Sequence, residues 1–202
     1  MALQGYPKTE KLKNGKSVTL RPMVAEDRDK LLAFWRQVPL EDRLFLKEDV
    51  TRPEVVQRWV TELNYDKVLP ILAELDGQVI GDGTLHIPAW GWRKHMAEVR
   101  VVVSREFRRQ GLGKILLRAL VDHAIQHGLE KLEAQFMSHQ KEAMAAFGAI
   151  GFRQVAELEG FVRDIQNKPR TLVIMVHNVQ DLWRMMEDLY ADMAHGEDRT
   201  RA

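Results

Sequence analysis

The chain has 202 residues, of which 45% are hydrophobic and 29% charged, a composition typical of one globular domain with a sizeable core. Its 30 Lys and Arg against 29 Asp and Glu leave a net charge of +1, and no apolar run reaches the roughly 18–20 residues that span a bilayer. We therefore expect a cytoplasmic protein without a nucleic-acid or membrane partner, and the absence of cysteine excludes disulfides, thiolate nucleophiles and cysteine-ligated metal sites.

The first third of the chain predicts one strand and two helices. Residues 18–23 alternate apolar and polar side chains, which indicates a strand that stops near Pro22. Residues 25–37 carry apolar side chains at helical spacing. Thr51 and Glu54 form a capping-box pattern with Pro53 between them, which predicts a second helix from there to about Leu63.

The middle of the chain predicts a hairpin, a strand and a long helix. Two strands over 68–75 and 78–87 are joined by Asp76-Gly77, a hairpin signal. Residues 97–103 are rich in β-branched side chains and predict a further strand. A helix over 111–127 follows and is expected to end at Gly128.

The last third predicts a strand over 132–137, a helix over 141–150, and strands over 153–162 and 171–176. Asn178 is expected to cap a final amphipathic helix. The order predicts an α/β fold with a mixed, mostly antiparallel central sheet and helices on both faces. We expect one domain over 1–177, an amphipathic helix over 178–195 that packs on this domain or on a second copy in a homodimer, and a flexible tail over 196–202.

The sharpest local signal is the run Arg-Arg-Gln-Gly-Leu-Gly-Lys at 108–114, where a strand ends and a helix begins. Glycines let the backbone approach a ligand closely, and a first helical turn offers unpaired N–H groups and the positive end of the dipole. Arg108, Arg109 and Lys114 add positive charge. The segment is suited to a pyrophosphate, and a plain strand-to-helix turn is the structural alternative.

Two common phosphate-binding patterns do not fit this run. A dinucleotide-binding fingerprint needs a third glycine where Leu116 stands, and a Walker A loop needs Ser or Thr where Ile115 stands. The spacing that fits is Arg/Gln-x-x-Gly-x-Gly/Ala, through Arg108, Gly111 and Gly113.

With this motif the chain resembles the GNAT acetyltransferase superfamily over roughly residues 18–176, in the order of elements as well as in the motif. The helix ending in Gly151-Phe152 is a second landmark of the family. Gln140 stands where the family often has Asn, and Phe147 where it often has Tyr. Phe147 has no hydroxyl and cannot protonate a leaving thiolate.

The resemblance implies acetyl-CoA as cosubstrate, no metal, and direct attack of a primary amine on the thioester. Main-chain groups of the strand before the glycines are expected to bond the pantetheine arm, and the glycine segment is expected to bind the pyrophosphate. The expected cofactor-binding residues are Val101, Val102, Val103, Arg108, Arg109, Gln110, Gly111, Leu112, Gly113, Lys114, Gln140 and Phe147.

The expected chemistry needs a base, because an alkylamine with a pKa of about 10.4 is almost wholly charged at pH 7. Glu98 is the first candidate, followed by His95 and His86. Strand parity places Glu98 on the opposite face from His95, unless a bulge exchanges the two sets. The structural alternatives are an ion pair of Glu98 with Arg100 or Lys94, and surface positions for the two histidines.

Several alternatives stay open at this point. The acceptor is either a small amine or a protein lysine or N-terminus, and a longer acyl-CoA donor would give the same motifs. A catalytically weak CoA-binding sensor or scaffold is the competing class, because Phe147 replaces the usual tyrosine. The loop over 90–95 would either line the acceptor pocket or cover the core, and residues 42–49 with the helix after Pro53 are expected to form the other wall. His123 and His127 have metal-ligand spacing, but a solvated helix border explains them better.

Overall fold

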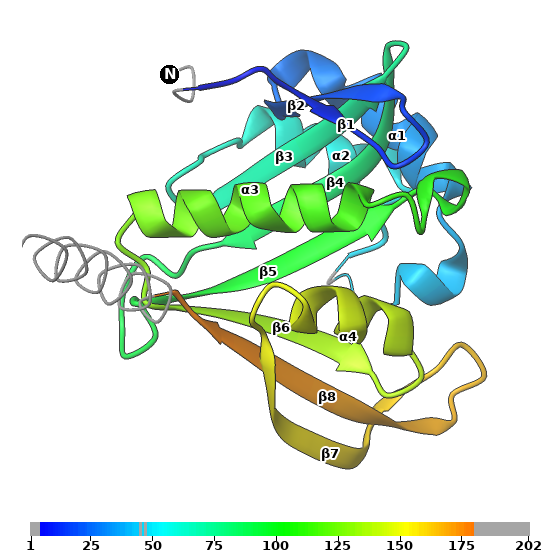
Figure 1. Ribbon diagram of the computed structural model, residues 1–202. Coiled ribbons are helices and arrows are strands. Elements are labelled where there is room, and N and C mark those ends of the chain that lie inside the picture. Colours follow the sequence, from blue (N-terminus) through cyan, green and yellow to red (C-terminus); the bar gives the residue numbers. More distant parts are fainter. Residues whose placement is uncertain (1–4, 45, 47, 180–202) are drawn as a thin grey trace, which may run out of the picture.

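The computed structural model describes residues 5–44, 46 and 48–179. An eight-stranded sheet runs through the molecule in the order β1-β2-β3-β4-β5-β6-β8-β7 (Figure 1). The strands are β1 (Lys8–Lys11), β2 (Ser17–Pro22), β3 (Val68–Leu75), β4 (Gln78–His86), β5 (Met96–Val103), β6 (Lys131–Met137), β7 (Arg153–Arg163) and β8 (Pro169–Asn178). The helices are α1 (Arg28–Gln37), α2 (Pro53–Thr61), α3 (Leu112–Gln126) and α4 (Lys141–Gly148), with short 3-10 turns η1 (Ala25–Asp27), η2 (Leu40–Asp42) and η3 (Arg105–Phe107).

Strand directions confirm the mixed, mostly antiparallel sheet. The pair β5 and β6 is parallel, and the other neighbouring strands in the described sheet are antiparallel. The parallel pair is connected by α3, as a crossover between parallel strands requires. The helix predicted over 178–195 and the tail predicted over 196–202 lie outside the described residues from position 180 on.

Helices cover both faces of the sheet, as predicted. On one face α3 packs on β3, β4 and β5, and two glycines of β4 allow it to lie close. A Cβ atom at Gly81 would stand 3.0 Å from a methyl of Leu116, and one at Gly83 would stand 3.2 Å from a methyl of Leu120. On the other face, α1 and α2 bury an apolar cluster that includes Trp35, Val56, Leu72 and Val102. The second face carries the cavity described below.

The first third contains one strand that was not predicted, and one prediction there was wrong. Strand β1 was not predicted, because its sequence Lys-Thr-Glu-Lys has no apolar alternation and is held at the sheet edge by pairing with β2. The capping box also does not form. The hydroxyl of Thr51 donates to Asp49 Oδ1 at 2.6 Å, and the helix is preceded by Arg52 without a side-chain cap. The Thr51 N–H donates to the same Asp49 oxygen at 3.1 Å, so Thr51 belongs to a local turn before the helix and not to its cap.

An ion network joins the start of α1 to the sheet. The guanidinium of Arg21 donates to both oxygens of Asp27 at 2.7 and 2.6 Å, and to Glu74 at 3.0 and 2.5 Å. Asp27 is 2% exposed. Burial alone would raise its pKa, but the hydrogen bonds from Arg21 and from the Val24 amide outweigh it, so the pKa is lowered. The network therefore positions η1 and α1 above the second face.

Candidate functional site

Strands β5 and β6 pair only at their beginnings and then diverge (Figure 1). Their ladder covers three residue pairs, the last being Glu98 with Glu133. Beyond it β5 remains paired with β4 up to Val103, and β6 remains paired with β8 up to Met137. Within the described sheet, the main-chain groups of β5 that point toward β6 after Glu98 therefore have no ladder partner. Such a strand edge can bond an extended ligand through N–H and C=O groups.

The glycine segment lies at the diverging end of these strands and opens α3. Gly111 has a φ of 91° and precedes the helix in the left-handed region, which favours glycine. The first helical bond at this end runs from the Ile115 N–H to the Gly111 carbonyl at 3.1 Å, so the amides of 112–114 come before any intrahelical acceptor. A Cβ atom at Gly113 would have only Val103 within 4 Å, at 3.9 Å. The helix end is thus open toward the last residue of β5.

Neighbouring elements hold this segment in place. The Lys13 N–H donates to the Gln110 carbonyl at 3.0 Å, which ties the β1–β2 turn to the glycine segment. Arg108 pairs with Asp42 at the end of η2, and Arg109 pairs with Glu142 in the first turn of α4. The two guanidinium groups therefore span the region where β5 and β6 separate, and Lys114 adds a third cation.

The structure gives the two remaining cofactor candidates, Gln140 and Phe147, different surroundings. Gln140 Oε1 accepts a hydrogen bond from the Met137 N–H at 2.7 Å, so its carbonyl is engaged and its amide nitrogen remains as a donor for a ligand. Phe147 is 6% exposed and packs edge-on against Phe136 and Phe152, each at 4.9 Å between ring centroids. Phe147 is therefore a core side chain in this structure.

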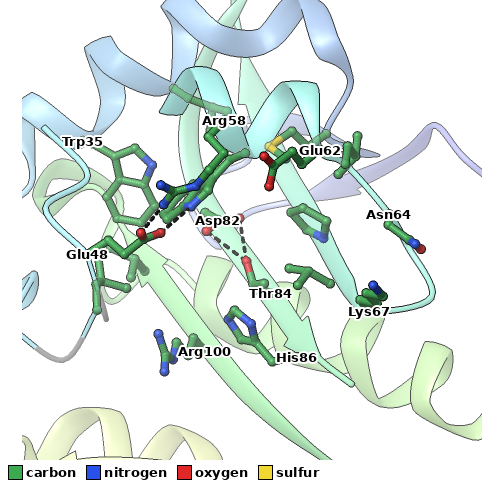
Figure 2. A pocket seen from close by; sticks show the side chains of 18 residues that line it. Trp35, Glu48, Arg58, Glu62, Asn64, Lys67, Asp82, Thr84, His86 and Arg100 are labelled. Atoms are coloured by element: carbon green, nitrogen blue, oxygen red, sulfur yellow. Dashed lines mark hydrogen bonds and ion pairs between the residues drawn. The ribbon is translucent and has the colours of Figure 1, made fainter. Parts of the chain in front are cut away.

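A cavity of about 310 Å³ lies on the second face, between α1, α2 and strands β3 to β5 (Figure 2). Leu46 and Glu48 from the predicted 42–49 wall line it, together with Arg58 and Trp59 of α2. The loop over 90–95 contributes no lining residue, and its Trp90 and Trp92 are 85% and 93% exposed. Of the two predictions for that loop, the structure supports neither the pocket wall nor the core cover.

The two arginines that line the cavity are already paired. Arg58 and the Trp59 Nε1–H, the latter at 2.9 Å, donate to Glu48. Arg100 donates to Glu98 Oε1 from Nε at 2.8 Å and from Nη2 at 2.5 Å. The positive charge on the cavity wall is thus partly neutralised by the protein itself.

Asp82 is the acidic side chain at the floor of the cavity. Figure 2 shows Asp82, Thr84 and His86 in a row along β4. The Thr84 hydroxyl donates to the two Asp82 oxygens at 3.2 and 3.1 Å, and no ion pair joins Asp82 to any cation in the described part of the chain. Burial raises the pKa of Asp82 to about 7, against the opposing effect of the Thr84 hydrogen bond.

The three predicted base candidates lie in different places. His86 lines the cavity. Glu98 is the cross-strand partner of His86, sits next to Glu133 of β6 and is bonded by Arg100, so the ion-pair alternative is confirmed for it. His95 precedes β5 and is not among the cavity-lining residues. The structure therefore brings Glu98 and His86 together and leaves His95 apart.

Sequence reasoning missed Asp82. In the sequence, Asp82 is an acid between two glycines, within a strand whose apolar neighbours are buried. A carboxylate at such a position destabilises the fold unless it has a binding or catalytic role.

The helical histidine pair needs a correction. His123 is not on a solvated border but is 3% exposed and stacks on Tyr6 at 5.3 Å. Burial lowers its pKa to about 4. The described residues contain no group of three or more His, Cys, Asp or Glu arranged to hold a metal ion. They also contain no helix that is long and apolar enough to cross a membrane.

Comparison with known proteins gives a consistent result. The model of a family described as the acetyltransferase (GNAT) family matches residues 21–152. The GNAT domain of S. lividans PAT superposes with a TM-score of 0.73 at 18% identity, covering 88% of this chain and 99% of that one. Mycobacterium smegmatis RimJ in complex with CoA-disulfide gives 0.70 at 20% identity, with coverages of 88% and 90%. The putative acetyltransferase yncA from Salmonella typhimurium, with acetyl-CoA, gives 0.70 at 17%, with coverages of 81% and 95%.

Proposed function

The chain belongs to the acetyltransferase (GNAT) family, and on that premise we propose that it transfers the acetyl group of acetyl-CoA to a primary amine by direct attack on the thioester. One observation carries the proposal. The strands β5 and β6 separate where α3 presents its N-terminus, and a cavity with an acid at its floor lies on the face opposite to that helix. A long acyl donor and a small acceptor could thus meet across β5.

The donor side fits acetyl-CoA in two respects. The main chain of Val101 to Val103 is free of ladder bonds on its β6 side and would bond the pantetheine arm as an added extended segment. The amides of 112–114, with Arg108 and Lys114 nearby, would bind the pyrophosphate. Gly113 leaves space for it, because only Val103 stands within 4 Å of its Cβ position. Related structures that hold acetyl-CoA or a CoA disulfide support the same donor.

The acceptor side supplies the amine. An ammonium group has to lose a proton before it attacks, and a positioned base contributes about 10²–10⁴-fold to such a step. Glu98 and His95 are the bases predicted from the sequence and stay predictions. Phe147 offers no hydroxyl at its buried position, so the leaving thiolate takes its proton from the attacking nitrogen or from water.

A protein that binds CoA without turnover is the second candidate. The observation in its favour is again Phe147, which occupies the place of the usual tyrosine and packs between two other aromatic rings. A sensor would still need the donor site, so it shares every expectation for acetyl-CoA binding and differs only in catalysis.

Calorimetric binding of acetyl-CoA, followed by a thiol-release screen, separates the two candidates. The screen covers alkylamines, polyamines, amino acids and lysine-containing peptides, each with acetyl-CoA and with a longer acyl-CoA. Binding with CoA release on one amine class supports the enzyme and identifies the acceptor. Binding without release on any amine supports the sensor, and the absence of acetyl-CoA binding would refute both.

A further inference from the structure

We propose that Asp82 binds the ammonium group of the acceptor in the cavity and accepts its proton, and that the acceptor is a primary amine on an apolar chain. This inference rests on the proposed function, because it assigns the acceptor to the cavity beside β5. It goes beyond that function by naming the recognising residue and the class of amine.

Asp82 lies on the strand next to the expected donor-binding strand. It pairs in register with Val102, the middle of the three valines expected to hold the pantetheine arm, and both side chains line the cavity. Glu98 lies four residues before Val102, which is about 13 Å along the strand at roughly 3.3 Å per residue. An amine held at Asp82 therefore lies across β5 from the expected pantetheine arm, on the face of the sheet that carries the cavity.

The charged side chains that face the cavity form no ion pair with Asp82 among the described residues. Glu48, Arg58 and Glu62 face the cavity from α2 and the segment before it, Lys67 from the start of β3, His86 from β4 and Arg100 from β5. The two arginines are paired with Glu48 and Glu98, and Glu62 and Lys67 stand at the exposed rim. Asp82 is left with a hydroxyl as its side-chain partner and no countercharge among the described residues.

Apolar side chains form the wall of the cavity beside Asp82. Trp35 is 1% exposed and meets Trp59 edge-on at 6.4 Å, and Met23, Leu31 and Val102 complete the surface beside Asp82. A hydrocarbon chain would bury its surface there while its cation reaches the carboxylate, with aromatic rings nearby that favour a positive charge. An acceptor with its own carboxylate would find the arginines already engaged.

Protonation of Asp82 fits this role. Burial raises the pKa of Asp82 to about 7, so the side chain can exchange a proton near neutral pH. An incoming ammonium supplies the missing positive charge and favours the carboxylate form.

The Asp82 carboxylate takes one proton from the ammonium and becomes a carboxylic acid, and the neutral amine attacks the thioester carbonyl. The C–N bond forms, the C–S bond breaks, and the second nitrogen proton passes to the sulfur, which leaves as the thiol. Asp82 then returns its proton to water, so that ammonium and thioester give amide, thiol and one proton.

The first test is calorimetry with n-hexylammonium as probe and n-hexanoate as its charge-reversed control, on the full chain and in two buffers of different ionisation enthalpy. At about pH 6 the wild type should release close to one proton on binding the probe, and at about pH 8 close to none, because the Asp82 pKa is about 7. Asp82→Asn should release none at either pH and bind at least about tenfold more weakly. Equal probe affinity in Asp82→Asn, or tighter binding of hexanoate, would overturn the proposal.

The second test is the pH profile of kcat/KM on the amine found by the screen. Asp82→Asn should lower kcat by about 10²–10⁴-fold, remove the acidic limb and leave the KM for acetyl-CoA unchanged. Thr84→Val removes the hydroxyl that stabilises the carboxylate, so the acidic limb should move to higher pH. A merely structural role for Asp82 would not move that limb.

Glu98→Gln is the comparison that assigns the base. Loss of the acidic limb in Glu98→Gln, with an unchanged profile in Asp82→Asn, would overturn the proposal and return the base to Glu98. If the wild type binds acetyl-CoA but acetylates no amine, the proposed function fails by itself. The proton-release test on n-hexylammonium then still decides whether Asp82 binds an ammonium group.

Discussion

The burial of Asp82 has a direct consequence for stability, which Asp82→Asn makes measurable. The pKa of this carboxyl is raised from 3.8 to about 7 in the folded protein. A raised pKa means that the folded state holds the proton more tightly than the unfolded state. Below about pH 4, Asp82 therefore does not reduce the free energy of unfolding. This free energy falls as the pH rises toward 7 and stays at its reduced value above pH 7. Asparagine has the same shape without this penalty.

The difference in pKa is about 3 units, which corresponds to at most about 4 kcal/mol at 1.36 kcal/mol per unit. Asp82 is only half-buried by its exposed surface, so solvent screens part of this penalty and we expect about 2 kcal/mol. Asp82→Asn should accordingly be about 2 kcal/mol more stable than the wild type at about pH 8, and close to it at about pH 4.5. The gain appears only on the alkaline side because the wild-type carboxyl is protonated on the acid side.

Urea unfolding followed by tryptophan fluorescence at these two pH values measures the effect. The exposed Asp66, changed to Asn, is the matched control for the loss of one carboxylate. A stability difference between Asp82→Asn and wild type that does not change with pH would refute the reasoning. A variant that is less stable than wild type at both pH values would show that the carboxylate stabilises the fold instead.

Three further predictions concern other parts of the molecule. Gly113→Leu should weaken acetyl-CoA binding at least about tenfold in calorimetry with no loss of thermal stability, whereas Gly113→Ala should bind nearly as wild type; Gly111 is less suitable because its φ of 91° strains any side chain. Burial lowers the pKa of His123 to about 4. The free energy of unfolding of the wild type should therefore fall by roughly 3 kcal/mol as the pH falls from about 6.5 to 4, and urea unfolding of His123→Phe should show no such loss. Asp27→Asn should destabilise by about 2–3 kcal/mol at neutral pH, because it removes the charge that Arg21 holds with two hydrogen bonds; a loss below 0.5 kcal/mol, as at an ordinary surface position, would contradict this.

The sequence was sufficient for the elements whose pattern is local. The hairpin at Asp76-Gly77, the strand leading to Val103 and the helix that opens after Gly111 follow from turn chemistry, β-branched residues and glycine spacing, each within about ten neighbouring residues. The sequence was also sufficient to identify the family, because the Arg-x-x-Gly-x-Gly spacing and the order of elements are features of the chain itself.

Only the tertiary structure decided which residues meet. Strand β1 exists because β2 offers it an edge, and Thr51 donates to Asp49 instead of capping its helix. Phe147 packs against Phe136 of β6, and His123 stacks on Tyr6 near the start of the chain. Asp82 could be recognised as a candidate site only in the tertiary structure, where α1 and α2 form a cavity over β4 with apolar walls and the two arginines of the cavity pair with Glu48 and Glu98. The periodicity of a strand says which residues share a face, but the cost of placing a charge on that face depends on what the rest of the chain packs against it.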